Sequence, residues 1–254
     1  MFKPDVLKTV SGAESKVNML KKDPAGYFVL SMLAGAFVGV GVLLAFTVGG
    51  LLDGAANTKI IMGLTFGVAL SLVIMAGSEL FTGNNMVMAL GLMDHKIKFK
   101  DAAWLWVLCW LGNLAGALVL AVIYHFTGLG TGNVAAFMAS SAATKMSLGI
   151  VPLITRGMLC NFLVCLAVWC ANRATSDAGK LIMVFWCLFA FITTGFEHSI
   201  ANMTLMAVAL MEPAEQAVSI GGYFYNLVFV TIGNMIGGIC FVALPYYFAS
   251  RKDD

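Results

Sequence analysis

The chain has 254 residues, of which 60% are hydrophobic and 11% charged, with a formal net charge of +2 and a mean hydropathy of +0.91. Because soluble domains average about 25% charged residues, this composition excludes an ordinary soluble domain. It indicates an all-α integral membrane protein that has the lipid bilayer as its partner. The small net charge gives no support to nucleic-acid binding, so we expect no nucleic-acid partner.

Residues 1–26 precede the first apolar segment and carry five lysines with acidic residues between them. This pattern is not that of a cleaved signal peptide. The spacing of Val6, Val10, Val17 and Leu20 predicts an amphipathic helix along the membrane surface. We expect a single transmembrane domain over 27–249 and a short tail at 250–254.

Six apolar segments are candidate membrane spans, at about 27–50, 60–93, 102–126, 148–171, 181–211 and 224–249. Four have the length of one crossing, since about 20 helical residues span the bilayer core. The second and fifth are too long for one helix across about 30 Å of hydrocarbon. We therefore predict that spans two and five are each broken at mid-membrane, around an irregular stretch that is buried in protein or lines a watery cavity.

Each long segment contains an octapeptide of the pattern G-x-E-x-x-x-small-N, at 77–84 and at 195–202. A second shared pattern, G-N-x-x-G, occurs at 112–116 and at 233–237. Both pairs are offset by about 120 residues, so one half of the chain repeats the other. In a membrane protein, paired polar breaks at corresponding places in two halves point to a transport site.

The basic residues predict the orientation. Twelve of the fifteen Lys and Arg residues fall in the N-terminal segment, in loops 94–101 and 172–180 and in the tail, whereas the other loops hold only Lys59 and Lys145. Basic loops stay on the cytoplasmic side, so both termini are predicted to be cytoplasmic. Three spans per half then make the repeats, about 27–126 and 148–249, inverted relative to each other.

His198 is the one histidine that we expect inside the membrane, where an ionisable side chain is costly and by default a functional candidate. A neutral packing histidine is the alternative. Glu79 and Glu197 occupy equivalent repeat positions. They either line a cation path or, as we favour, stabilise the starts of the half-helices and point away from the path. Thr82 offers a hydroxyl at the first break.

The remaining polar residues of the apolar segments have structural alternatives. Asn84, Asn113, Asn202 and Asn234 are candidate links between helices, and the glycines of the G-N-x-x-G patterns indicate close helix packing. Lys145 lies just before span four, where a solvated lysine at the interface is the plain interpretation. Arg156 lies deeper and is expected to snorkel or to pair. Asn161 follows it and is placed to face the centre.

Apolar residues flank both breaks and either pack ordinarily or form hydrophobic constrictions that exclude hydrated ions: Phe66, Leu70, Leu80, Phe81 and Phe191. The six cysteines lie in apolar segments without metal-ligand spacing, so we expect no metal and no cofactor. An intramembrane enzyme using Glu197 and His198 is a rival, but the nucleophile and metal motifs that it needs do not accompany them. We therefore expect that the protein is not an enzyme.

At these residues the chain resembles the formate/nitrite transporter family over nearly its whole length. The motifs are G-S-E-L-F-T-G-N at 77–84, L-C-N-F-L-V-C-L-A-V-W at 159–169, G-F-E-H-S-I-A-N-M at 195–203 and V-T-I-G-N-x-x-G-G from 230. The third span and the short loop at 172–180 are most similar to the nitrite-channel branch. The resemblance implies an aquaporin-like protomer with its own pore, assembled as a homopentamer in the bacterial cytoplasmic (inner) membrane.

The resemblance also implies roles for individual residues. His198 would be the central pore histidine, with Thr82 facing it and Asn202 in the same polar site. Lys145, Asn161 and Glu197 would form a buried polar cluster. Two constrictions would bracket the site, with Leu70 and Phe191 on one side and Leu80, Phe81 and the nearby Phe66 on the other.

We expect a channel or transporter for small monovalent weak-acid anions, with nitrite as the first candidate. Protonation near His198 would let the anion cross as the neutral acid, because burial disfavours the charged form. Formate and hydrosulfide are alternatives within the same family. A water or glycerol channel is a further rival, although neither break contains Asn-Pro-Ala.

Overall fold

The computed structural model describes residues 2–251, and these residues form helices and connecting turns without any strand. The first half contains α1 (Lys3–Lys22), α2 (Pro24–Leu51), α3 (Thr58–Phe66), α4 (Val68–Leu72), the π-helical turn η1 (Val73–Gly77), α5 (Phe81–Met93) and α6 (Phe99–Phe126). The second half contains α7 (Gly132–Ser147), α8 (Ile150–Arg173), α9 (Asp177–Thr194), α10 (Ser199–Met211), α11 (Ile220–Gly238), the π-helical turn η2 (Ile239–Ala243) and α12 (Leu244–Arg251).

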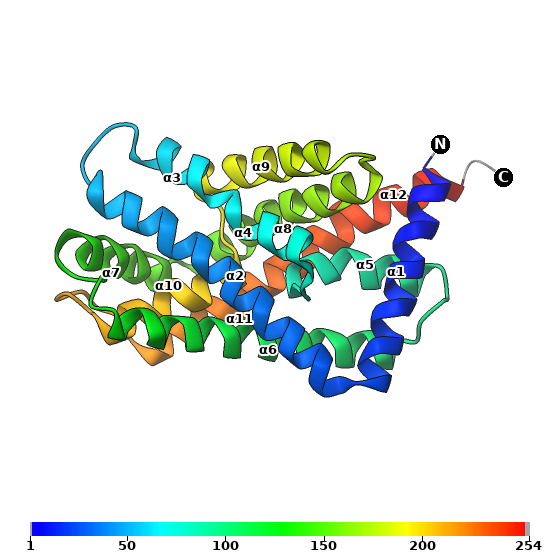
Figure 1. Ribbon diagram of the computed structural model, residues 1–254, viewed down its shortest axis with the longest axis horizontal. Helices are drawn as coiled ribbons and strands as arrows, with labels where there is room; N and C mark the ends of the chain where they lie inside the picture. The colour runs from blue at the N-terminus through cyan, green and yellow to red at the C-terminus, as the bar shows by residue number, and fades with distance from the viewer. Residues whose placement is uncertain (1, 252–254) are drawn as a thin grey trace.

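Within the described residues, six helical stretches are long and apolar enough to cross a membrane: Pro24–Leu51, Thr58–Gly77, Phe99–Phe126, Ile150–Arg173, Asp177–Thr194 and Ile220–Arg251. The predicted all-α membrane class with six spans is therefore confirmed. Figure 1 shows these helices side by side in an elongated bundle.

Glycines let two pairs of helices cross closely. A Cβ on Gly35 of α2 would collide with the backbone carbonyl of Asn113, and one on Gly116 of α6 with that of Met32. The second half repeats this contact, since a Cβ on Gly233 of α11 would collide with the carbonyl of Ile154 on α8. Small residues allow such backbone approach in membranes. The G-N-x-x-G patterns thus hold α2 against α6 and α8 against α11.

The helical path is interrupted at both octapeptides. The π-helical turn η1 ends at Gly77, residues 78–80 are not helical, and α5 starts at Phe81. Likewise α9 ends at Thr194 and α10 starts at Ser199. Gly77 and Gly195 have φ angles of +80° and +83°, in the left-handed region that glycine adopts without steric cost. The glycine shared by the two octapeptides ends each helix.

The helix α7 is an element that the sequence analysis did not predict. It occupies 132–147, between the third and fourth predicted spans, and buries Val134, Met138, Ala142 and Met146 along one face. Lys145 therefore lies on the last turn of a helix rather than in the interface loop that the plain interpretation assumed. The missed signal is this spacing of four residues, which is typical of an amphipathic helix.

The helix α1 lies across one end of the bundle, beside α12, while α7 lies at the opposite end (Figure 1). Its four apolar residues Val6, Val10, Val17 and Leu20 are buried against the protein. The predicted tail begins inside α12, which includes Ser250 and Arg251. Lys252 and the rest of the predicted tail lie outside the described residues.

Candidate transport site

The two helix breaks meet through one hydrogen bond. Thr82 lies in the first turn of α5, and its Oγ1 is 3.0 Å from Nε2 of His198. His198 is the N-cap residue of α10, and its Nδ1 accepts a hydrogen bond of 3.1 Å from the backbone N–H of Ala201. Thr82 is fully buried and His198 is 3% exposed.

These contacts determine where the hydrogen atoms of Thr82 and His198 lie when the imidazole is neutral. Because Nδ1 accepts the Ala201 N–H, the ring proton of a neutral imidazole resides on Nε2 and is donated to Thr82 Oγ1. The hydroxyl hydrogen of Thr82 is then available to a further acceptor. A second ring proton, on Nδ1, would face the Ala201 N–H, so the imidazole must leave this cap to take one up.

Apolar side chains enclose the imidazole. A space of only about 10 Å³ beside it is lined by Val38, Phe66, Ala69, Leu70, Leu80, Val164, Leu188, Phe191 and His198. A cavity needs roughly 10–15 Å³ to hold one water molecule. We call these nine residues the neck. It leaves no room for a hydrated ion, as a hydrophobic constriction requires.

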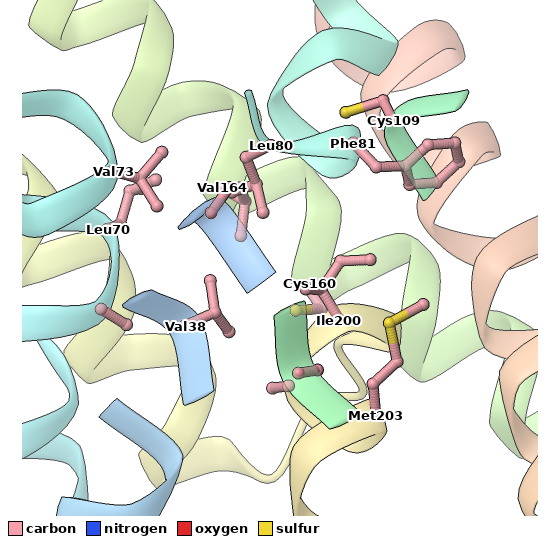
Figure 2. Close-up of a cluster of buried hydrophobic side chains, with 14 of the residues drawn as sticks. Val38, Leu70, Val73, Leu80, Phe81, Cys109, Cys160, Val164, Ile200 and Met203 are labelled. Carbon is pink, nitrogen blue, oxygen red and sulfur yellow. The ribbon is translucent and has the colours of Figure 1, made fainter. Parts of the chain in front are cut away.

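The neck differs from the predicted constrictions at two residues. The ring of Phe66 packs edge-to-face on Phe191 at a centroid distance of 5.4 Å, so Phe66 pairs with Phe191 rather than with Phe81. Phe81 does not line the neck, and Figure 2 shows its ring on the side of Cys109, away from Leu70. Leu80 and Phe81 are consecutive at a helix start, so their side chains point in different directions.

Glu197, the residue before His198, is buried in a polar cluster. Its Oε1 lies 2.8 Å from Lys145 Nζ, and its Oε2 accepts a hydrogen bond of 2.7 Å from Asn202. Asn202 also donates to Asn226 Oδ1 at 2.8 Å, and Asn226 donates to the backbone carbonyl of Lys145 at 3.0 Å. Asn202 thus belongs to the Glu197 cluster: among the described residues its side chain hydrogen-bonds to Glu197 and Asn226 and not to His198 or Thr82, which differs from the role that the resemblance implied.

Glu79 has a matching cluster at the first break. Its Oε1 pairs with Lys16 Nζ at 2.5 Å, and its Oε2 accepts hydrogen bonds of 2.9 Å from both Tyr27 and Asn84. Asn84 lies five residues after Glu79 and donates a hydrogen bond to it, as Asn202 does to Glu197. Both carboxylates bind side chains instead of the helix-start N–H groups that the sequence analysis favoured.

The helix-start N–H groups are bound by asparagines of the G-N-x-x-G patterns. Asn113 Oδ1 accepts from the Phe81 N–H at 2.9 Å, and its Nδ2 donates to the Glu79 carbonyl at 2.9 Å. Asn234 does the same for Ser199 and Glu197, at 3.0 Å in both bonds. Each asparagine therefore fastens a residue of the break and the first residue of the following helix to a neighbouring helix.

Asn161 joins the two halves. Its Nδ2 donates to the backbone carbonyls of Asn234 at 2.6 Å and of Thr82 at 3.2 Å. Among the described residues it makes no direct hydrogen bond to Lys145 or Glu197, as the implied cluster required, but is linked to Glu197 through Asn234. Sequence reasoning missed Lys16, Tyr27 and Asn226, whose partners lie 24 to 81 residues away in the chain.

Two open cavities approach the neck from opposite ends. The α1 cavity has a volume of about 510 Å³ and is lined by Lys8, Lys16, Ser78, Glu79 and Leu80 among others. The α7 cavity, of about 480 Å³, is lined by Asp53, Lys59, Lys145, Arg156 and Glu197 among others. Each contains one of the two Lys–Glu pairs. The arrangement is that of two polar vestibules separated by an apolar neck with a single imidazole.

Comparison with known proteins gives one family. The family model described as formate/nitrite transporter matches residues 5–248. The chain is 41% identical to the nitrite transporter NirC of Escherichia coli (strain K12), over 99% of this chain and 94% of that protein.

Two solved structures share the fold. One, described as an FNT family ion channel, superposes with a TM-score of 0.93 at 38% identity and covers 97% of this chain and 98% of its own. A pentameric formate channel with formate bound gives a TM-score of 0.79 at 27% identity, over 90% of this chain and 98% of its own. These proteins are named transporters and channels, not enzymes. The chain belongs to the formate/nitrite transporter family, as its octapeptides indicated, and is an anion transporter or channel of that family.

Proposed function

We propose that this protein conducts small monovalent weak-acid anions through the neck, and that nitrite is the first candidate. The observation that carries the proposal is the Thr82–His198 hydrogen bond of 3.0 Å inside an otherwise apolar enclosure. The similarity to NirC supports nitrite. Formate is the alternative supported by the formate-bound channel, and hydrosulfide is a further small weak-acid anion for the same path.

The anion would first enter a vestibule, where Lys16 or Lys145 attracts it. Each lysine is partly exposed while its glutamate partner is nearly buried, so the positive group is the one that the vestibule presents. Entering the neck strips water from the ion, which costs several kcal/mol. Burial disfavours the charged form, so the pKa of the anion's conjugate acid rises there. The anion would take up a proton and cross as the neutral acid.

Thr82 and His198 would serve this proton exchange. With Nε2–H donated to Thr82 Oγ1, the threonine hydroxyl donates to an oxygen of the anion. The imidazole delivers a net proton only after gaining one on Nδ1, which requires it to leave the Ala201 cap. Otherwise solvent supplies the proton. Chloride, which is not protonated near neutral pH, has no such path.

We further propose that the first and second halves are inverted repeats, in which α3 through η1 with α5 and α9 with α10 form broken spans two and five. The matched hydrogen bonds of Asn113 and Asn234 to the two breaks support this equivalence. The proposed domains are the N-terminal segment 1–26, the channel domain 27–249 and the tail 250–254.

In the cell, the protein would span the bacterial cytoplasmic (inner) membrane with both termini cytoplasmic, as its basic loops predict. The helix α1 and the last turn of α12 lie at the same end of the bundle (Figure 1), which agrees with that orientation. The pentameric formate channel supports assembly as a homopentamer.

Uptake into liposomes containing the purified protein tests the proposal. We expect nitrite, formate and hydrosulfide to enter faster at pH 5 than at pH 8, and chloride and glycerol to enter no faster than in protein-free liposomes. Glycerol uptake equal to that of nitrite would support a neutral-solute channel instead, and chloride uptake equal to nitrite would contradict passage as the acid.

A further inference from the structure

Arg156 is a cationic residue that has no role in the transport path proposed above. It lies near the start of α8 and lines the α7 cavity together with Lys145 and Glu197. Its backbone carbonyl accepts a hydrogen bond of 3.3 Å from the Glu197 N–H. The residue is thereby fixed next to the second break, while its side chain is exposed.

The guanidinium has no protein partner among the described residues, since neither a hydrogen bond nor an ion pair involves it. Two carboxylates line the same cavity, Asp53 and Glu197, but Glu197 is held by Lys145 at 2.8 Å. Arg156, whose guanidinium carries five N–H donors, therefore lines the α7 cavity without a partner from the described part of the chain. An arginine inside a membrane-spanning helix is expected to pair, so this one is placed for a ligand that comes from outside the chain.

We propose that Arg156 binds the anion in the α7 cavity, before the neck, through two parallel N–H···O hydrogen bonds. The inference rests on the proposed function and adds a specificity site to it. A guanidinium fork matches a planar group with two oxygens, which is the shape of both nitrite and formate. Hydrosulfide and chloride each present a single acceptor atom, so they would gain the electrostatic attraction of the guanidinium but not the pair of parallel hydrogen bonds.

The net charge of the α7 cavity does not by itself favour nitrite and formate over hydrosulfide. The cavity is lined by three cations, Lys59, Lys145 and Arg156, and by two carboxylates, Asp53 and Glu197. A lysine acts on any monovalent anion as a point charge. Discrimination between oxyanions and hydrosulfide therefore depends on the shape of the guanidinium.

The variants Arg156→Lys and Arg156→Gln separate shape from charge. In liposomes, we expect Arg156→Lys to raise the half-saturating concentration of nitrite and formate about threefold, the size typical of one exposed charged contact. The value for hydrosulfide should stay unchanged. Arg156→Gln should raise the value for all three anions, and that for nitrite and formate most. The control Lys59→Gln removes one charge from the same cavity and should shift all three by the same factor.

Binding without transport provides a second readout. Line broadening of ¹³C-formate by the detergent-purified protein should weaken about threefold in Arg156→Lys, with an unchanged unfolding temperature. Broadening that persists in a wild type without uptake would support the Arg156 site and contradict the proposed function. Equal uptake constants and equal broadening in the wild type and Arg156→Lys would overturn the inference, as would equal changes for formate and hydrosulfide.

Discussion

At the scale of single residues, the two octapeptides contribute different side chains to the candidate site. The first supplies the Thr82 hydroxyl and the second the His198 imidazole, and a hydrogen bond of 3.0 Å joins them. Both residues were predictable because they stand at polar breaks in apolar segments. Lys16 and Tyr27 were not, because their contacts with Glu79 depend on how α1 and the start of α2 pack against the first break.

Substitution of Thr82 by valine tests the hydroxyl. The change leaves the Nε2–H of a buried imidazole without its acceptor, which costs roughly 1–3 kcal/mol. It also removes the proposed donor to the anion. We expect nitrite uptake to fall at least about tenfold. Thr204→Val is the matched control, since Thr204 is also fully buried but its hydroxyl has no hydrogen-bond partner within residues 2–251. Equal losses in both variants would contradict a special role for Thr82.

Removal of Lys145 tests the polar cluster. Lys145→Gln leaves the Glu197 carboxylate buried without its countercharge, so we expect a lower unfolding temperature and weaker uptake at low nitrite concentration. Lys145→Gln combined with Glu197→Gln should recover the unfolding temperature but not the uptake, because the buried charge is gone while the attracting charge is still missing. Recovery of uptake in the double variant would show that Lys145 serves stability alone.

At the scale of elements, the breaks are built by glycine and asparagine. Their positions were predictable from the length of the apolar segments and from the shared motif. The helix α7 was not predicted, because its amphipathic pattern is shorter and less apolar than the membrane spans on either side of it. The hydrogen bonds of Asn113 and Asn234 to the breaks and to the helix starts that follow them need helices α6 and α11 in place. No local pattern contains that information.

Alanine at Gly77 or Gly195 tests the left-handed helix ends. Apart from the glycine and its two chain neighbours, no atom of the described residues lies within 4 Å of the Cβ that alanine would add, so the cost comes from the positive φ alone. We expect about 1–2 kcal/mol of destabilisation for each variant, measured as a lower unfolding temperature in detergent. Gly12→Ala is the control, because Gly12 lies within α1 and also has open space around its Cβ position. It should be neutral or slightly stabilising.

At the scale of the whole molecule, two vestibules face one neck from opposite ends. The Lys–Glu pairs and the asparagines beside the breaks match between halves, whereas α1 and α7 supply the two lysines from different elements. The inverted relation of the two halves stays a prediction from the loop charges and the repeated motifs. The elements that complete each vestibule could not be predicted in this way, because α1 lies before the repeated segments and α7 lies between them.

Native mass spectrometry tests the assembly. We expect one dominant species of five chains, each of 27.0 kDa. The basis is the likeness to a pentameric formate channel at a TM-score of 0.79. A dominant monomer or dimer that remains active in liposomes would contradict the homopentamer.

The most direct test of proton-linked passage is the pH profile of nitrite uptake in His198→Asn. Asparagine can accept the Ala201 N–H and so retain the helix cap, but it does not titrate. We predict that the wild type takes up nitrite faster as the pH falls from 8 to 5, and that His198→Asn loses this pH-dependent uptake while its unfolding temperature is retained. The same uptake rate and the same pH profile in both proteins would contradict the role of His198.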